Sequence, residues 1–266
     1  GGSMGTAIAS VLARAGLDVQ LGCRTTSQAS RLLDDRENAA YLPGVVLEAG
    51  IEPKTVREIE FGGVDLVVLA VPCNSLPAAI GEIGARVGER SAVLVTSKGL
   101  VPPLGTTPTA YVAERVHARA VASLGGPAHA REAIEVGAAV VVATRDGDLR
   151  RQLREVLGAG GLTVETTDDV TGAELAACAK NAAALASGAA AMRGANLAGA
   201  AAGKVFSEVH ELALASGGRS ETDVNDVAVN PAGGSPAAAT TTTPAACRLI
   251  SRRNVTSSTV DRSWGW

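Results

Sequence analysis

The chain has 266 residues, enough for two modest domains or one large one. Hydrophobic residues make up 46% of it and aromatic residues only 2%, so we expect a core built from alanine, valine and leucine. The formal net charge of −3 gives no electrostatic reason to expect nucleic acid or an anionic membrane as partner. No apolar stretch approaches the ~20 residues of a membrane span without interruption.

The cysteines indicate a reducing compartment. Cys23, Cys73, Cys178 and Cys247 form no CxxC pair, and no histidine stands at metal-ligand spacing. Isolated thiols in a chain of this size are typical of cytosolic proteins rather than of a disulfide framework. No cleavable secretory signal is recognisable at the start. We therefore expect a cytoplasmic protein with no metal site.

The first residues form a glycine-rich turn. Gly2 and Gly5 run directly into an alanine- and leucine-rich helix that ends near Gly16. Their spacing is that of the last two glycines of a dinucleotide-binding turn, where N–H groups at a helix N-terminus hold the pyrophosphate. The strand and the first glycine of that fingerprint would stand ahead of Gly1. Without that strand, we expect strands 19–23 and 65–71 to lack a shared neighbour.

The next strand, over residues 18–24, ends at the position where a Rossmann fold meets the adenosine ribose. Arg24 stands where an acidic residue would bind the 2′-hydroxyl of NAD. A guanidinium there suits the 2′-phosphate of NADP. A solvated arginine at a strand end is the alternative interpretation.

The middle of the chain alternates between apolar runs and helical patterns, which indicates an α/β fold with a Rossmann-type doubly wound parallel sheet. In residues 147–158, Leu149, Leu153 and Leu157 lie on one face of an amphipathic helix. We expect further helices at 30–36, 76–87 and 108–119, and further strands at 64–71, 91–96, 120–124, 138–144 and 162–167.

Lys98 directly follows the strand predicted at 91–96. Ligands of open α/β sheets bind at the carboxyl ends of the strands, so Lys98 is a candidate contact for an anion or substrate. A lysine on a surface loop is the alternative.

Beyond Asp168 the pattern changes to alanine-rich helix over residues 170–217, which Asp169 or Thr171 can cap. Lys180 and Asn181 lie within a run of small apolar residues there, which is not an ordinary solvated face. Burial would lower the pKa of Lys180 towards a range useful for proton transfer. A lysine that extends to the surface is the alternative.

These patterns divide the chain into three parts. Residues 1–167 are expected to form an NAD(P)-binding Rossmann domain that lacks its first strand. Residues 168–222 are expected to form an incomplete all-α domain for substrate binding and catalysis. Residues 223–266 are low in complexity and have neither helical nor strand period, so they predict a disordered tail.

Taken together, six stretches of residues 1–222 resemble bacterial NAD(P)-dependent glycerol-3-phosphate dehydrogenases in order and spacing. The glycine turn is common to many dehydrogenases, whereas the stretch at 36–45 and the series SKG, GGP and KN are specific to this family. The six are Gly2-Ser3-Met4-Gly5-Thr6-Ala7, Arg36-Glu37-Asn38-Ala39-Ala40-Tyr41-Leu42-Pro43-Gly44-Val45, Val67-Val68-Leu69-Ala70-Val71-Pro72, Ser97-Lys98-Gly99-Leu100, Gly125-Gly126-Pro127-Ala128-His129-Ala130 and Glu174-Leu175-Ala176-Ala177-Cys178-Ala179-Lys180-Asn181.

The resemblance implies an oxidoreductase that interconverts dihydroxyacetone phosphate, a small phosphate substrate, and sn-glycerol 3-phosphate with NAD or NADP, in glycerophospholipid synthesis. It implies that Lys180 is the proton acceptor, with Asn181 beside it in the catalytic set, and that Lys98 touches substrate and cofactor. A homodimer is also expected. The implied cofactor contacts are Gly2, Ser3, Met4, Gly5, Arg24, Lys98 and Ala130, and the implied substrate contacts are Lys98, Gly126 and Lys180.

The sequence also departs from the family pattern. Ala128 replaces a Ser or Thr whose hydroxyl would bond the substrate, a loss of about 0.5–1.5 kcal/mol. After residue 222 the expected Gly-Asp loop and Ser-Arg-Asn segment do not appear in register, and Ser251-Arg252-Arg253-Asn254 matches the latter only superficially. The abrupt change suggests a reading-frame shift in the source sequence. Two alternatives therefore stay open: an inactive dinucleotide-binding remnant, or a β-hydroxyacid dehydrogenase relative.

Overall fold

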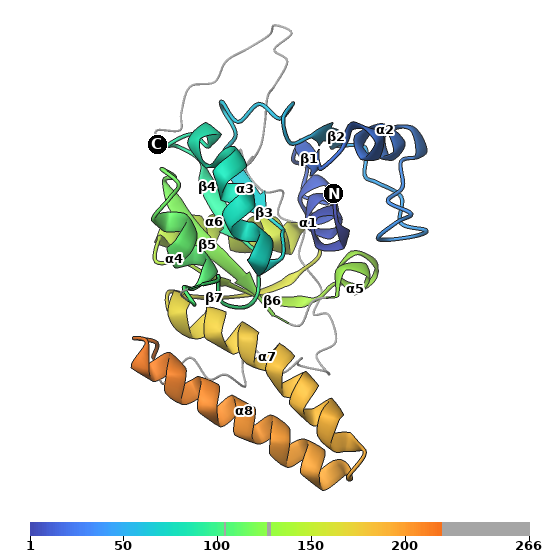
Figure 1. Cartoon of the computed structure of the whole chain (residues 1–266). Helices are drawn as coiled ribbons and strands as arrows, with labels where there is room; N and C mark the ends of the chain where they lie inside the picture. Colours follow the sequence, from blue (N-terminus) through green and yellow to red (C-terminus); the bar gives the residue numbers. More distant parts are fainter. Residues whose placement is uncertain (104, 127–128, 220–266) are drawn as a thin grey trace, which may run out of the picture.

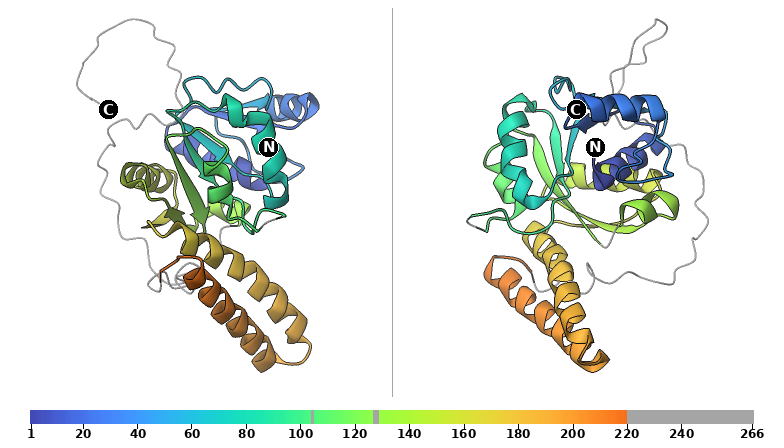
Figure 2. Two further views of the ribbon diagram at one scale, coloured as in Figure 1. Left: turned by 60° about the vertical axis from the view of Figure 1, so that its left-hand side comes forward. Right: turned by 45° about the vertical axis from the view of Figure 1, so that its right-hand side comes forward.

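The computed structural model describes residues 1–103, 105–126 and 129–219. Figure 1 shows a body of strands and helices from which two long helices extend, α7 (Val170–Ala191) and α8 (Ala195–Ala215). The views in Figure 2 show these two helices side by side as a hairpin. The predicted change to helix after Asp168 is therefore confirmed. Within the described residues, no helix is long and apolar enough to cross a membrane.

The strands of the body form two sheets. One holds the parallel pair β1 (Val19–Cys23) and β2 (Ile51–Thr55). The other has the order β3-β4-β5-β6-β7. Its neighbours are parallel except β5 and β6, which are antiparallel, with Ser123 opposite Ala143. The bounds of its strands are β3 (Leu66–Leu69), β4 (Ala92–Val95), β5 (Ala120–Gly125), β6 (Ala139–Ala143) and β7 (Thr163–Thr167).

The sheet is thus dominated by parallel strands, as the sequence predicts, but it is not wholly parallel. In its described residues, the connection from β5 to β6 contains one short helix, α5 (Ala130–Glu135), which packs on α1 (Ser3–Arg14). The chain therefore returns into the sheet in the opposite direction.

Among the described residues, β1 and β3 belong to separate sheets and have no common neighbour, as expected. Strand β2 was not predicted. It contains Pro53 and three further residues with polar side chains, which hides the apolar alternation. In the described part of the chain β2 pairs with β1 alone, which makes it an edge strand, where proline is tolerated.

Both faces of the five-stranded sheet are covered, as in a doubly wound fold. Along β4, Leu94 packs in the cluster that includes α1 and α6 (Gly147–Ala159), whereas Val93 and Val95 pack in the cluster that includes α3 (Leu76–Ile83) and α4 (Pro108–Ala113). This alternation follows from the two-residue period of a strand. The predicted apolar face of α6 is confirmed, because Leu149, Leu153 and Leu157 are fully buried.

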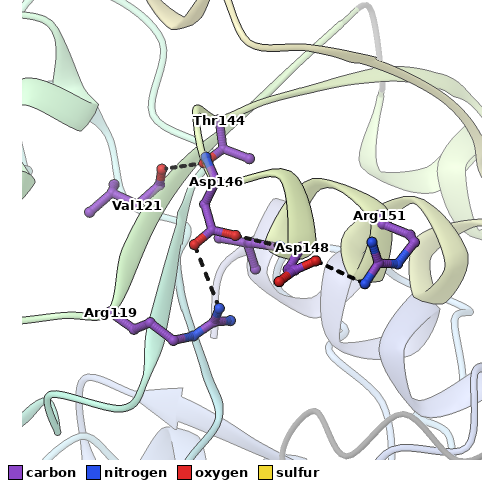
Figure 3. Close-up of polar contacts among 7 residues, drawn as sticks. Arg119, Val121, Thr144, Asp146, Asp148 and Arg151 are labelled. Atoms are coloured by element: carbon purple, nitrogen blue, oxygen red, sulfur yellow. Dashed lines mark hydrogen bonds and ion pairs between the residues drawn. The ribbon is translucent and has the colours of Figure 1, made fainter. Parts of the chain in front are cut away.

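Polar contacts fix the start of α6 against the sheet (Figure 3). Asp146 Oδ1 accepts the N–H of Leu149 at 2.7 Å, and Oδ2 lies 3.7 Å from Arg119 Nη1 beside β5. The Thr144 hydroxyl donates to the Val121 carbonyl at 3.0 Å. Together they join β5, β6 and α6.

Three helices differ in length from the sequence-based expectation. Helix α2 (Thr26–Asp35) begins four residues early because the Thr25 hydroxyl accepts the N–H of Gln28 and caps it. The helix predicted over 76–87 is α3 followed by a 3-10 turn, Gly84–Arg86. The helix predicted over 108–119 ends at Ala113.

Candidate active site

The N-terminal turn of α1 presents backbone N–H groups that have no acceptor within the helix itself. Gly2 caps the helix without any side-chain hydrogen bond, and a Cβ placed on it would meet no atom within 4 Å. A Cβ on Gly5 would lie 3.5 Å from that of Ala70, just after β3, so the helix start packs directly against this strand end. Open space beside the N-terminal N–H groups of a helix suits an anionic group such as a pyrophosphate.

Asn38 holds this turn in place. Its amide donates to the Gly1 carbonyl at 3.1 Å and to the Thr6 hydroxyl at 2.7 Å, and the residue is 2% exposed. Gln28 donates to the same Gly1 carbonyl at 2.8 Å. The irregular segment that contains Asn38 therefore supports the glycine turn, a role that the sequence did not reveal.

Two residues of the same segment, Leu42 and Val45, pack with Ala7 of α1 and Ile134 of α5. Ala130, predicted as a cofactor contact, is partly buried against this cluster. The structure thus brings the start of α5 next to α1, the helix that begins at the glycine turn.

Arg24 lies at the carboxyl end of β1, as predicted, and its Nη2 donates to the Tyr41 hydroxyl at 3.2 Å. It lines a surface pocket of about 560 Å³ together with Arg57, Thr25, Thr26 and Glu82, among others. The two guanidinium groups outnumber the one carboxylate, so the pocket favours an anion. Arg57 follows β2 and was missed because that strand was missed.

Lys98 joins the ends of two neighbouring strands. It follows β4, and its Nζ donates to the carbonyl of Gly126 after β5 at 2.7 Å. Burial and the nearby ammonium of Lys180 lower the pKa of Lys98. Two lysines far apart in the sequence are therefore close enough in space to repel each other.

Gly126 cannot be another residue without distortion. Its φ is +113°, and an added Cβ would lie 2.8 Å from the Ala139 carbonyl oxygen. This backbone conformation brings its carbonyl to Lys98. Ala128, the predicted departure from the family pattern, lies outside the described residues, as does Ser251-Arg252-Arg253-Asn254.

Helix α7 brings Lys180 to this edge of the sheet. Asp169 caps the helix, as predicted, by accepting the N–H of Gly172 at 2.9 Å. Ala176 and Ala179 are fully buried against partners that include Val141 of β6. Lys180 is half-buried.

Asn181 is exposed. The expectation that it lies off the solvated face is therefore wrong.

The described part of the chain contains no group of three or more His, Cys, Asp or Glu side chains that could hold a metal ion. The site consists of a helix N-terminus, an arginine-lined pocket and two lysines at the carboxyl edge of the strands. Such an arrangement can bind anionic groups and transfer a proton through an amine.

The comparisons with known proteins agree with this geometry. Residues 1–149 match the family model described as the N-terminus of NAD-dependent glycerol-3-phosphate dehydrogenase. The chain is 33% identical over 228 residues to the glycerol-3-phosphate dehydrogenase [NAD(P)+] of Azorhizobium caulinodans, covering 83% of this chain and 68% of that one. It is 34% identical over 225 residues to that of Caulobacter vibrioides, covering 83% and 67%.

Solved structures give the same result. The glycerol-3-phosphate dehydrogenase of Coxiella burnetii is 25% identical, with a TM-score of 0.79 over 86% of this chain and 72% of that one. A yeast glycerol-3-phosphate dehydrogenase at 22% identity, with a TM-score of 0.73 over 88% and 76% of the two chains, supports the fold.

Proposed function

The chain belongs to the glycerol-3-phosphate dehydrogenase family, and from this premise we propose that it interconverts dihydroxyacetone phosphate and sn-glycerol 3-phosphate with NAD or NADP. The observation that carries the proposal is the pair Lys98 and Lys180, which β4 and α7 bring to one edge of the sheet. The matches do not favour a β-hydroxyacid dehydrogenase or an inactive remnant.

The residues at the sheet edge fit a dinucleotide. The open N-terminal turn of α1, with Gly2, Ser3, Met4 and Gly5, would hold the pyrophosphate, and Lys98 and Ala130 would lie along the nicotinamide half. When bound, the nicotinamide supplies a hydride for reduction of the carbonyl or accepts one on oxidation of the alcohol.

Arg24 and Arg57 would bind the 2′-phosphate of NADP, since both line the pocket at the ends of β1 and β2. This pair makes NADP the preferred cofactor. Guanidinium groups suit phosphate because their donors match its oxygens in pairs.

The proton of the reaction is assigned to Lys180. In the reduction, its ammonium gives a proton to the C2 oxygen of dihydroxyacetone phosphate, and in the oxidation its amine takes the proton from the C2 hydroxyl. Lys98 and the backbone of Gly126 contact the substrate, with Lys98 offsetting the phosphate charge. Asn181 joins the catalytic set next to Lys180, from the exposed side of α7.

Two parts of the chain share this work. Residues 1–167 form the cofactor-binding domain, and residues 168–222, of which those up to 219 are described, form the helical part that supplies Lys180. A homodimer also belongs to the proposal, because the helical hairpin carries exposed apolar side chains such as Leu185 and Met192. Light scattering on the purified chain measures its oligomeric state.

A steady-state assay of NADPH oxidation tests the proposed activity. Dihydroxyacetone phosphate should support turnover, whereas dihydroxyacetone, which lacks the phosphate, should support little. Equal rates with the two ketones, or no turnover with either, would contradict the proposed substrate.

A further inference from the structure

Helix α7 carries a buried carboxylate among its alanines. Glu174 is 4% exposed, and its Oε1 accepts the backbone N–H of Thr109 at 3.0 Å. Its Oε2 shares a 2.5 Å hydrogen bond with the Thr109 hydroxyl, and the nearby Thr107 hydroxyl favours the charged form of the carboxyl group, which acts to lower its pKa. Burying a carboxyl group is costly unless it is hydrogen-bonded, and here both oxygens have partners at the start of α4.

One helical turn later, α7 lies beside the loop that leads from β4 to α4. The backbone of Gly99 lies beside the thiol of Cys178, close enough to act on its pKa. Glu174 and Cys178 are four residues apart and therefore lie on one face of the helix. Residues 96–107 connect β4 to α4, so this face of α7 lies beside Gly99 near the start of the loop and binds Thr109 just after its end.

The loop itself is closed at its base. The N–H of Val101 donates to the Thr106 carbonyl at 2.8 Å, and the two residues form a β-bridge. A closed loop that is held at both ends has one register on the helix. Lys98 is part of this loop, next to Gly99.

We propose that Glu174 is a positioning residue, which binds the start of α4 and thereby fixes the distance between Lys98 on the loop and Lys180 on α7. This inference rests on the proposed function, because it concerns the two lysines of that reaction. Glu174 itself touches neither of them.

The surroundings of Glu174 indicate which substitution preserves its role. The groups near it are the hydroxyl of Thr109, which is bonded to it, the hydroxyl of Thr107, and the thiols of Cys73 and Cys178. Burial raises the pKa of Glu174, so a neutral side chain is tolerated at this place. Glutamine keeps an oxygen for the Thr109 N–H and a donor for its hydroxyl, whereas leucine fills similar space without either.

The test compares four variants of the full chain with the wild type: Glu174→Gln, Glu174→Leu, Thr109→Val and the control Glu155→Ala. Glu155 is an exposed carboxylate on α6. Misplacement of a reacting group by about 1 Å can cost about 100-fold in rate. We expect kcat to fall about 10- to 100-fold in Glu174→Leu and by a smaller factor in Thr109→Val. In Glu174→Gln and in the control, kcat should stay within about threefold of the wild-type value. The KM for NADPH should stay within about twofold throughout, because the proposed contacts of its pyrophosphate and adenosine half are on α1 and at the ends of β1 and β2.

A second readout does not depend on turnover. The pH dependence of acetylation of Lys98 by acetic anhydride, followed by mass spectrometry, reports its pKa. In Glu174→Leu this pKa should rise because Lys180 moves away, and in Glu174→Gln it should match the wild type.

The two readouts separate the possible outcomes. Absence of turnover in the wild type would contradict the proposed function, and the labelling would still decide the role of Glu174. A Glu174→Leu variant with an unchanged labelling curve would overturn the inference, whatever its kcat or melting temperature. If that variant does not fold, Thr109→Val decides in the same way.

Discussion

Replacing Gly126 with alanine tests the backbone geometry that brings Lys98 to the end of β5. The φ of +113° is strained for any residue with a Cβ, at a cost of about 1–3 kcal/mol. The added Cβ would also lie 2.8 Å from the Ala139 carbonyl oxygen and 3.0 Å from the Val140 Cα, in a neighbouring strand. Overpacking of this kind costs a further ~1–3 kcal/mol. We therefore expect the free energy of unfolding to fall by about 2–6 kcal/mol.

Urea denaturation monitored by circular dichroism measures this change, with Gly158→Ala as the matched control. Gly158 lies inside α6, and a Cβ on it would meet no atom within 4 Å. That substitution should stabilise the chain by about 0.5–1 kcal/mol, because alanine favours a helix. If Gly126→Ala unfolded at the same urea concentration as Gly158→Ala, the geometric argument would be refuted.

Further predictions concern the lysine, the glycine turn and the arginine pocket. The folded state lowers the pKa of Lys98, so the unfolded chain holds the extra proton between that pKa and about 10.4, and stability rises with pH over this window. Lys98→Met should abolish this part of the rise in stability. Urea midpoints of the wild type and the variant at a series of pH values measure the rise. Parallel curves for the two proteins would contradict the prediction. Asn38→Ala removes two hydrogen bonds to the turn and should cost about 1–3 kcal/mol of stability and weaken NADPH binding in a fluorescence titration. Arg24→Ala and Arg57→Ala should each raise the KM for NADPH by about 10- to 100-fold, from the ~1.5–3 kcal/mol of a charge-assisted hydrogen bond, and leave the KM for NADH unchanged. Equal effects on the two cofactors would exclude a 2′-phosphate contact.

Much of the fold could be predicted because its buried strands are continuous apolar runs. The run at 92–95 is fully buried and packs on both faces, so its continuous apolar sequence directly predicts a strand in the interior of the sheet. The direction of β6 could not be predicted in this way. It depends on where α5 packs, and α5 lies on α1, far away in the sequence.

The candidate site, like the fold, could be predicted from the sequence only where the signal is local. Lys98 was recognised because it follows a predicted strand, and Lys180 because a charge within alanines is unusual. Asn38 and Glu174 received no role, because their partners are distant: Asn38 bonds Thr6 across 32 positions, and Glu174 bonds Thr109 across 65. The residues next to a polar residue in the sequence do not indicate which distant residue its side chain bonds.

The most direct test of the account is the rate of NADPH oxidation by dihydroxyacetone phosphate in the wild type, Lys180→Met and Lys204→Met. Lys204 lies on α8 and pairs with Glu208 in solvent, so it controls for loss of a lysine from the helical hairpin. A positioned proton donor contributes about 100- to 10,000-fold to a rate, so kcat should fall by that factor in Lys180→Met alone, with NADPH binding retained. A wild-type rate in Lys180→Met would contradict the assignment of the proton to this lysine.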